Sequence, residues 1–394
     1  MERKLSAAWW GTVVLFLVHG AIVGTWVSRI PAIQSALRLN NGILGLTLLA
    51  SAAGAVSTIP LAGWLITRYG SKKVTGASGV MFCVVVVLPG LAFNAITLAA
   101  ALFIFGAIAA AMDVSMNAQG VEVEKKLGKP TMSRFHAMFS AGAMAGAGVG
   151  GLLASHGVAP AAHFAMSGAI SVAAIAAVSR RLLETHSNVL QQRNGLPLKR
   201  IPRVLMALSA IGFCILLSEG AMSDWTAVYL RQALRAGPGM AATGYAVFSA
   251  AMAGFRFLGD WITSRLGPLL AVRMGCLLAA FGLVWALSVH LPGWTFSGFA
   301  ITGAGLSVII PLVFGSGGRV ESVSPGTGIA TVTGIGYIGF IVGPPAIGFA
   351  SQLFTLRYAL GIVVACCLIA AWLSRFMVGF EKAGSGEPIV ELHI

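Results

Sequence analysis

Residues 41–95 read NGILGLTLLASAAGAVSTIPLAGWLITRYGSKKVTGASGVMFCVVVVLPGLAFNA, and their pattern decides the fold. Two apolar stretches, 41–66 and 74–93, each have about the length that a helix needs to cross a bilayer. The gap between them, residues 68–73, carries one Arg and two Lys, whereas the next gap, 94–95, is short and uncharged. This alternation predicts two consecutive membrane-spanning helices with the basic gap on the cytoplasmic side.

The same alternation runs through the whole chain and predicts an all-α integral membrane protein. Of the 394 residues, 57% are hydrophobic and only 10% are charged, a composition with which a soluble domain would precipitate. Twelve spans leave about 33 residues for each helix and its loop, so no sizeable soluble domain is expected. The predicted spans are 10–29, 41–66, 74–93, 96–120, 133–156, 161–179, 204–229, 240–262, 270–290, 294–316, 327–350 and 358–377.

The distribution of basic residues predicts the orientation in the membrane. If the amino terminus is cytoplasmic, only five of the 26 Lys and Arg residues fall outside: Arg29, Arg38, Arg231, Arg235 and Arg357. The positive-inside rule therefore predicts a multi-pass membrane protein with both termini in the cytoplasm. This asymmetry also explains the net charge of +14 without nucleic acid, which would need a basic face on a soluble fold.

The chain divides into two similar halves. Its longest polar interval predicts a cytoplasmic linker at 181–203, between a six-helix bundle at 1–180 and a second one, with a short cytoplasmic tail, at 204–394. The segment WLITRYG at 64–70 reappears as WITSRLG at 261–267, displaced by 197 residues, which indicates a duplication. The same displacement relates Gly106 to Gly303, Gly142 to Gly339 and Gly146 to Gly343.

The two six-helix halves, the charged central loop and the Gly-x4-Arg-x-Gly turn after the second span resemble the major facilitator superfamily of secondary transporters. The resemblance covers nearly the whole chain and implies twelve transmembrane helices in two pseudosymmetric six-helix bundles, with no enzymatic activity. Arg68 and Gly70 of the turn are candidates for a gating or structural latch. Within the superfamily, a bacterial inner-membrane branch distantly related to the fucose permeases is similar in segments 19–20, Trp26, 112–120 and 219–225.

Two motifs depart from the superfamily pattern. The turn usually carries an acidic residue where Thr67 stands and a basic residue where Ser71 stands. Drug antiporters carry a Gly-Pro motif in helix five, whereas here Gly339, Gly343 and Pro344 place it in helix eleven, which counts against drug antiport. We expect these glycines to allow close packing or rocking of helices, and the proline to kink its helix and shape a gate.

Acidic residues inside the spans are the main candidates for function, because an ionised group at the bilayer centre costs ~3 kcal/mol or more unless it is paired or hydrated. Asp113 lies two-thirds through its span with Asn117 one turn later on the same face, which makes it the first candidate for a substrate or proton ligand. Glu219 lies in mid-span, where it could load and unload a proton near neutral pH. The alternative for both acids is a purely structural role in packing.

Two histidines add further titratable groups to the spans. His19 lies two turns from Trp26 on one helix face, and the indole offers a stacking surface for a sugar ring or an aromatic solute. A hydrogen-bonded core histidine is the alternative. His136 and Ser140 share a face near the cytoplasmic rim, where they are candidates for gating or binding.

Four other residues are candidates for binding or gating. Asp224 and Trp225 follow Glu219 toward the outer rim, where a solvated acid and an interfacial tryptophan are the alternative to a binding role. Arg256 and Asp260 lie one turn apart near the cytoplasmic end, a spacing that predicts an ion pair. We expect this pair to act as a gating or structural latch.

The absence of a Walker sequence favours transport driven by a gradient. The five cysteines lie within apolar runs, so neither a metal site nor a cofactor is expected. We predict a secondary active transporter that couples protons to import of a small polar solute, sugar-like or another metabolite, by alternating access. Its partners would be the solute, protons and membrane lipid, and the chain would act as a monomer. The alternatives are a proton antiporter that exports drugs or metabolites, and a non-transporting membrane sensor or scaffold.

Overall fold

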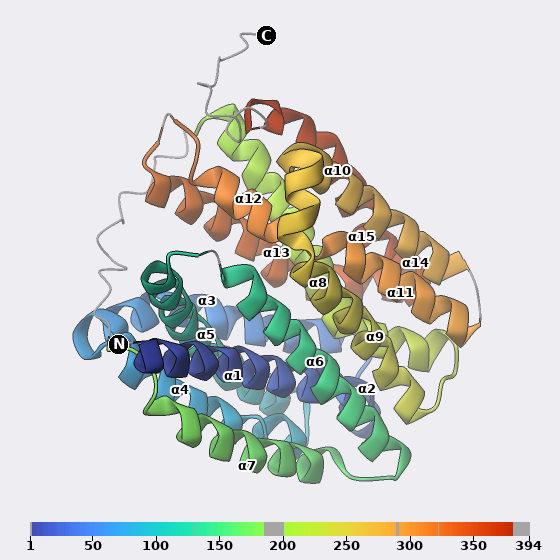
Figure 1. Cartoon of the computed structure of the whole chain (residues 1–394). Helices are drawn as coiled ribbons and strands as arrows, with labels where there is room; N and C mark the ends of the chain where they lie inside the picture. Colours follow the sequence, from blue (N-terminus) through green and yellow to red (C-terminus); the bar gives the residue numbers. More distant parts are fainter. Residues whose placement is uncertain (1, 130, 185–200, 289–290, 322, 381–394) are drawn as a thin grey trace.

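The computed structural model describes residues 2–129, 131–184, 201–288, 291–321 and 323–380. Within these ranges every regular element is a helix (Figure 1). Eleven helical segments are long and apolar enough to cross a membrane. The remaining predicted span, the eighth along the chain, corresponds to α9, which has 20 residues and is not among these eleven. The predicted all-α membrane fold is confirmed.

The first half of the chain forms one bundle, drawn in blue to green in Figure 1. Within it α1 packs on α6, α3 on α5, and α4 on both α5 and α7. Its helices are α1 (Glu2–Val27), α2 (Ile30–Ala36), α3 (Asn41–Tyr69), α4 (Ser71–Val85), η1 (Leu88–Leu91), α5 (Ala95–Leu127), α6 (Met132–Ser155) and α7 (Pro160–Ser179).

The second half forms the other bundle, in which α8 packs on α13 and α10 on α11. Its helices are α8 (Arg203–Ala233), α9 (Pro238–Phe257), α10 (Gly259–Ser288), α11 (Pro292–Leu306), α12 (Ile309–Gly317), α13 (Pro325–Leu353), α14 (Leu356–Ala359), α15 (Gly361–Leu373) and η3 (Ser374–Phe380). Most of the predicted linker (185–200), the end of one predicted span (289–290) and the tail (381–394) lie outside the described residues.

Three predicted spans of the second half differ from the observed helices, and one of them, 358–377, is divided among α14, α15 and η3. The span expected at 240–262 ends earlier, because α9 stops at Phe257 and α10 starts at Gly259. Within α10, Gly267 has φ 73° and the following Pro268 lacks a backbone donor, so the membrane-crossing part begins only there. The span expected at 294–316 is divided into α11 and α12.

Polar side chains begin several of these helices. The Asn40 side chain accepts a hydrogen bond from the Ile43 amide at 2.9 Å and caps α3. Asn94 and Thr97 form a reciprocal capping box at the start of α5, which satisfies two amide groups that the helix itself leaves unpaired. The asparagines between these spans therefore serve as helix caps.

The geometry of helix contacts shows that the two halves are equivalent. A side chain added at Gly106 of α5 would collide with the carbonyl of Ser51 on α3. At Gly303 of α11 it would collide with the carbonyl of Phe248 on α9. Both members of the first contact are displaced by 197 residues from those of the second. Gly106 and Gly303 therefore mark the same helix crossing in the two halves, which supports the duplication.

The turn after the second helix of each half repeats as well. The Arg68 guanidinium lies 5.4 Å from the ring centroid of Trp64, and that of Arg265 lies 5.9 Å from that of Trp261. Each arginine is followed after one residue by a glycine with positive φ, Gly70 at 84° and Gly267 at 73°.

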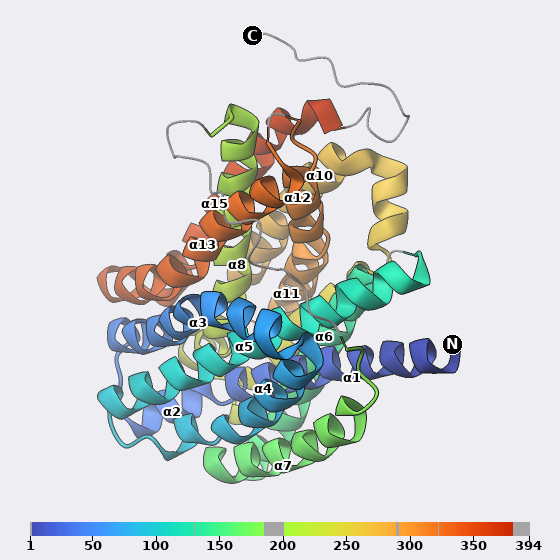
Figure 2. The same cartoon turned by 90° about the vertical axis from the view of Figure 1, so that its left-hand side faces the viewer.

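The two bundles meet along α3 with α13 (Figure 2) and along α6 with α9 (Figure 1), and we call this interface the seam. We call the end that holds the start of α1 and the loops 68–73 and 125–129 the basic end, and the other the far end. At the far end a side chain at Gly45 would come within 2.6 Å of the Pro344 carbonyl, and one at Gly151 within 2.9 Å of the Gly239 carbonyl. Backbones of both bundles thus touch at the far end and close the seam there.

Candidate substrate and proton-coupling site

Three predicted residues of the first bundle, His19, Asp113 and Asn117, lie close together between α1 and α5. The His19 Nδ1 and Asp113 Oδ1 atoms lie 3.9 Å apart, which is too far for a hydrogen bond. The Asn117 amide donates to Asp113 Oδ1 at 3.1 Å and to its carbonyl at 2.8 Å. The Asp113 side chain is 34% exposed although it lies within a membrane span, so this carboxyl group is only partly covered by protein.

The His19 ring is held by aromatic neighbours. It packs edge-on against Phe82 at 4.9 Å and Phe139 at 5.5 Å between ring centroids. Within the described part of the chain, neither of its ring nitrogens has a hydrogen-bond partner. Both nitrogens are buried, so the imidazole is closed off from solvent in the conformation that the structure describes, beside the partly exposed Asp113 carboxylate.

Arg256 of α9 forms the centre of the other group. Its Nη2 lies 3.5 Å from Glu219 Oε2 on α8, and its Nη1 donates to Ser140 Oγ on α6 at 2.8 Å. Its Nε donates to the Ser307 carbonyl, between α11 and α12, at 3.2 Å. Arg256 therefore pairs with an acid of its own bundle and with a hydroxyl of the other bundle.

The predicted ion pair between Arg256 and Asp260 is wrong. The structure gives Arg256 a different acid, Glu219, and the described residues include no ion pair for Asp260. The helix ends at Phe257, so the one-turn spacing does not apply across the break. The latch role predicted for the two residues stays a prediction.

A cavity of about 50 Å³ lies on the basic side of Arg256. His136 and Ser133 of the first bundle and Arg256, Asp260 and Thr263 of the second line it. The His136 ring packs edge-on against Phe16 at 5.2 Å between centroids. His136 therefore lies at the seam, as its predicted gating role requires.

The two tryptophans are buried, which argues against exposed stacking surfaces. Trp225 is 0% exposed, so the interpretation of an interfacial ring at the outer rim is wrong. Trp26 is 5% exposed and packs on Phe105 and Phe164 inside the first bundle. Asp224 is half-buried, and its Oδ1 accepts a hydrogen bond from Ser223 at 3.4 Å.

The predicted gating residues have separate roles. Gly339 and Gly343 pack α13 closely on Leu217 of α8, within one bundle. Pro344 instead lies at the seam between bundles, and α13 continues through it as one helix. Gly70 forms the turn after α3, where Arg68 stacks on neighbouring aromatic rings.

Two members of the Arg256 group, Tyr245 and Ser307, were not predicted from the sequence. Tyr245 of α9 is buried and lies within electrostatic range of Glu219, Asp224 and Arg256. Ser307 contributes a backbone carbonyl, which no side-chain pattern reveals. The intervals of four and eleven residues that join Tyr245, Ser249 and Arg256 place them on one helix face, and this spacing could have identified the tyrosine.

The duplicated bundles with ionisable groups at their interface define a polytopic membrane transporter. The chain belongs to the major facilitator superfamily, whose family model matches residues 9–320. An uncharacterised MFS-type transporter of Yersinia pestis is 33% identical over 365 residues, which cover 92% of this chain and 94% of that one. An uncharacterised transporter of Sinorhizobium fredii is 32% identical over 374 residues, with coverage of 94% and 98%.

Solved structures share the fold. A bacterial homologue of the human lysosomal transporter Spinster, in an inward-facing and unoccupied conformation, superposes with a TM-score of 0.73 at 15% identity, covering 96% of this chain and 97% of that one. The nucleoside transporter NupG gives 0.71 at 13%, with coverage of 93% and 99%. The Escherichia coli fucose:proton symporter gives 0.61 at 18%, with coverage of 93% and 98%. At these identities the likeness concerns the fold alone.

Proposed function

We propose that this chain imports a small polar solute together with protons across the bacterial inner membrane by alternating access. The observation that carries the proposal is the position of Arg256, which binds Glu219 within its bundle and Ser140 across the seam. Protonation of Glu219 removes the charge that holds Arg256, and the guanidinium is then free to change its contact with the other bundle. A proton on one side chain is thereby coupled to the relative position of the bundles.

The half-buried carboxylate of Asp113, with His19 and Asn117 beside it, supplies the polar contacts for the solute. These groups offer an acceptor, an amide and an imidazole at short range, which suits a solute with several hydroxyl groups. The proteins that share the fold include a nucleoside transporter and a fucose:proton symporter, and both nucleosides and fucose contain a sugar ring. We therefore propose a sugar-like metabolite as the solute class.

The test uses proteoliposomes that contain a pH-sensitive dye and receive sugars, nucleosides and polyols from outside. We expect one class of solute to acidify the lumen in the wild type. Glu219→Gln and Asp113→Asn should each abolish this signal, because neither amide can carry a proton. Glu122→Gln is the matched control, since its carboxylate pairs only with Lys126 on the same helix. Retained coupled uptake in both site variants would refute the mechanism.

The same assay separates the alternative functions. A proton antiporter would make the lumen alkaline when solute moves inward, and a sensor or scaffold would give no solute flux at all. The direction of the signal therefore distinguishes import with protons from exchange against them.

The proposed orientation places the basic end in the cytoplasm. Phe93, 76% exposed at the far end, would then be accessible from outside the cell. A Phe93→Cys variant should react with an impermeant maleimide in intact cells, while the native cysteines, all buried, stay unlabelled. Labelling only after the cells are opened would reverse the assignment.

A further inference from the structure

The five arginines expected outside the membrane have two distinct roles. Arg29 donates a hydrogen bond to the Val158 carbonyl, and Arg357 donates to the Ser288 carbonyl at 3.2 Å. These two residues brace the backbone of neighbouring segments. The other three, Arg38, Arg231 and Arg235, line a single cavity of about 440 Å³ at the far end.

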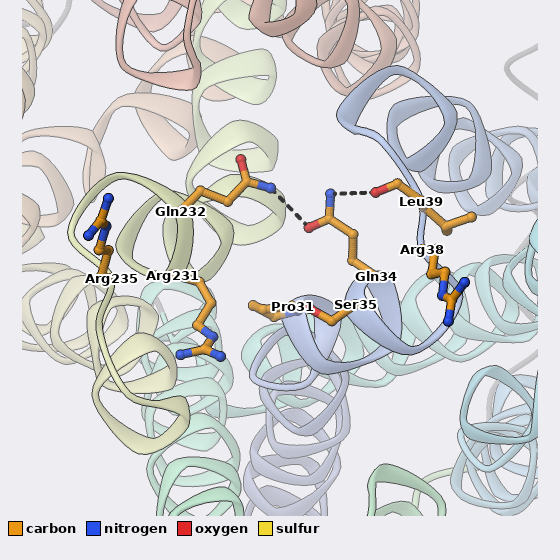
Figure 3. A pocket seen from close by; sticks show the side chains of 8 residues that line it. All are labelled: Pro31, Gln34, Ser35, Arg38, Leu39, Arg231, Gln232 and Arg235. Atoms are coloured by element: carbon orange, nitrogen blue, oxygen red, sulfur yellow. Dashed lines mark hydrogen bonds between the residues drawn. The ribbon is translucent and has the colours of Figure 1, made fainter.

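Both bundles contribute to this cavity, which we call the far-end cavity (Figure 3). Arg38 follows α2 in the first bundle, and Arg231 and Arg235 belong to the end of α8 and the turn after it. In Figure 3 the Arg38 side chain lies on one flank of the cavity and those of Arg231 and Arg235 on the opposite flank, with Gln34 and Gln232 meeting between them. The Gln232 amide donates to Gln34 Oε1 at 3.3 Å, so the cavity spans the seam.

Two of the arginines occupy equivalent positions in the duplicated halves. Arg38 ends the segment Ala-Leu-Arg at 36–38, and Arg235 ends the same segment at 233–235, again displaced by 197 residues. They are the only non-glycine residues with positive φ in the described ranges, at 53° and 51°. The turn thus places an arginine at the same point of each half in a backbone conformation that such residues seldom adopt.

The positive charge in the far-end cavity is not neutralised by an acid of the protein. No Asp or Glu lines the cavity, and none of the three arginines takes part in an ion pair within the described residues. Arg231 donates one hydrogen bond, to the Ala236 carbonyl at 2.7 Å. All three side chains are exposed and can turn toward the cavity, where a ligand with negative charge would give them charge-assisted hydrogen bonds.

We propose that the far-end cavity binds a small anion with at least two negative charges, of the carboxylate or phosphate class, and that this anion holds the bundles together at the far end. Arg38 moves with the first bundle, whereas Arg231 and Arg235 move with the second. Opening of the far end separates the two sets, so an anion bound to both favours the closed seam. This site is separate from the solute site around Asp113, and its test requires no transport.

The first experiment measures the unfolding midpoint of the purified full chain at low ionic strength, with citrate as the probe. Citrate should raise the midpoint of the wild type, and acetate at equal ionic strength should not. Arg38→Gln combined with Arg235→Gln should weaken apparent citrate binding roughly tenfold or more, because two of three charge-assisted contacts are lost. The matched control is Arg68→Gln with Arg265→Gln, which removes the same charge at the basic end from positions also 197 residues apart. Equal citrate affinity in both double variants would overturn the proposal.

The second experiment measures the seam itself. Spin labels at Phe93→Cys and Phe354→Cys, both exposed at the far end, report the distance between bundles. Citrate should increase the population with the shorter distance, and an unchanged distribution at saturating citrate would contradict the proposal.

Nanodiscs with and without cardiolipin test the other source of such an anion. If cardiolipin stabilises the protein through these arginines and citrate does not, the ligand is a lipid headgroup and the soluble-anion proposal is wrong.

Discussion

Arg256 makes three contacts with three different segments, and its geometry explains how it does so. The guanidinium is a planar fork with five N–H donors, so one side chain can bind Glu219, Ser140 and the Ser307 carbonyl together. Its side chain is only 9% exposed, so these contacts replace the hydration that the charge loses. Arg256 is therefore the residue on which both the second bundle and the seam depend.

Arg256→Lys should reduce transport more than ~10-fold, because a lysine ammonium cannot reproduce the fork and leaves part of the buried Glu219 carboxylate unsatisfied. Asp260→Asn is the matched comparison and should keep transport within about twofold, since this exposed acid takes part in no buried pair. Solute-driven acidification of proteoliposomes measures both variants. Equal losses would mean that Asp260 belongs to the coupling machinery after all.

The sequence predicted individual site residues better than their partners. Asp113 and Asn117 share a helix, so the interval of four residues was enough to predict their contact, which the structure contains. The approach of His19 to Asp113 joins two helices, and no spacing along one helix reports it. The exposure of Trp225 was predicted wrongly for the same reason. Its distance from the centre of its helix suggested an exposed ring near the rim, but its exposure depends on which helices cover it.

At the scale of helices, glycine decides how closely two axes approach. Gly106 lets α5 touch the backbone of α3, and Gly303 lets α11 touch that of α9. Contact between helix backbones compensates in a membrane for the missing hydrophobic driving force between helices. The repeated crossing therefore stabilises each bundle by the same means.

Gly106→Ala and Gly303→Ala should each lower stability by about 1–3 kcal/mol, because the added methyl group collides with a backbone carbonyl that cannot rotate away. Gly254→Ala is the control on α9, where no atom lies within 4 Å of the new side chain. It should be neutral or stabilising by up to ~1 kcal/mol. Unfolding midpoints in detergent measure all three, and a stable Gly303→Ala beside an unstable Gly106→Ala would mean that the two crossings are not equivalent.

Helix positions followed from hydropathy, whereas breaks within helices did not. The sequence placed a single span at 240–262, although the helix ends at Phe257 and resumes at Gly259. Apolar residues continue across this break and across the one between α11 and α12, so hydropathy does not detect either break. Gly267 before Pro268 was the signal that a break lies in this region, and its match with Gly70 shows that it belongs to the duplicated turn.

At the scale of the whole molecule, ion pairs lie to one side of the seam, whereas hydrogen bonds join the bundles across it. None of the four ion pairs of the described residues joins one bundle to the other: three involve the first bundle, one of them with Glu184 just beyond it, and the fourth lies in the second bundle. The contacts across the seam that we find are hydrogen bonds, such as Gln232 to Asn41 at 2.9 Å and Gln352 to Asn40 at 2.7 Å. The bundles can therefore move apart without separating an ion pair, which keeps the cost of rocking small.

Gln232→Ala tests this division, because its amide exchanges two hydrogen bonds with Asn41 and donates a third to Gln34. Their loss should weaken the closed far end by about 1–2 kcal/mol, roughly a fivefold to thirtyfold change in the closed-to-open ratio. Spin labels at Phe93→Cys and Phe354→Cys should then report a larger population with the long distance between the bundles.

Gln119→Ala is the matched control, since its amide binds Ser71 and Leu183 in the first half of the chain. It should lower the unfolding midpoint and leave the distance distribution unchanged. If both variants shift the distances equally, the seam is not an independent unit, and alternating access would have to involve changes inside the bundles.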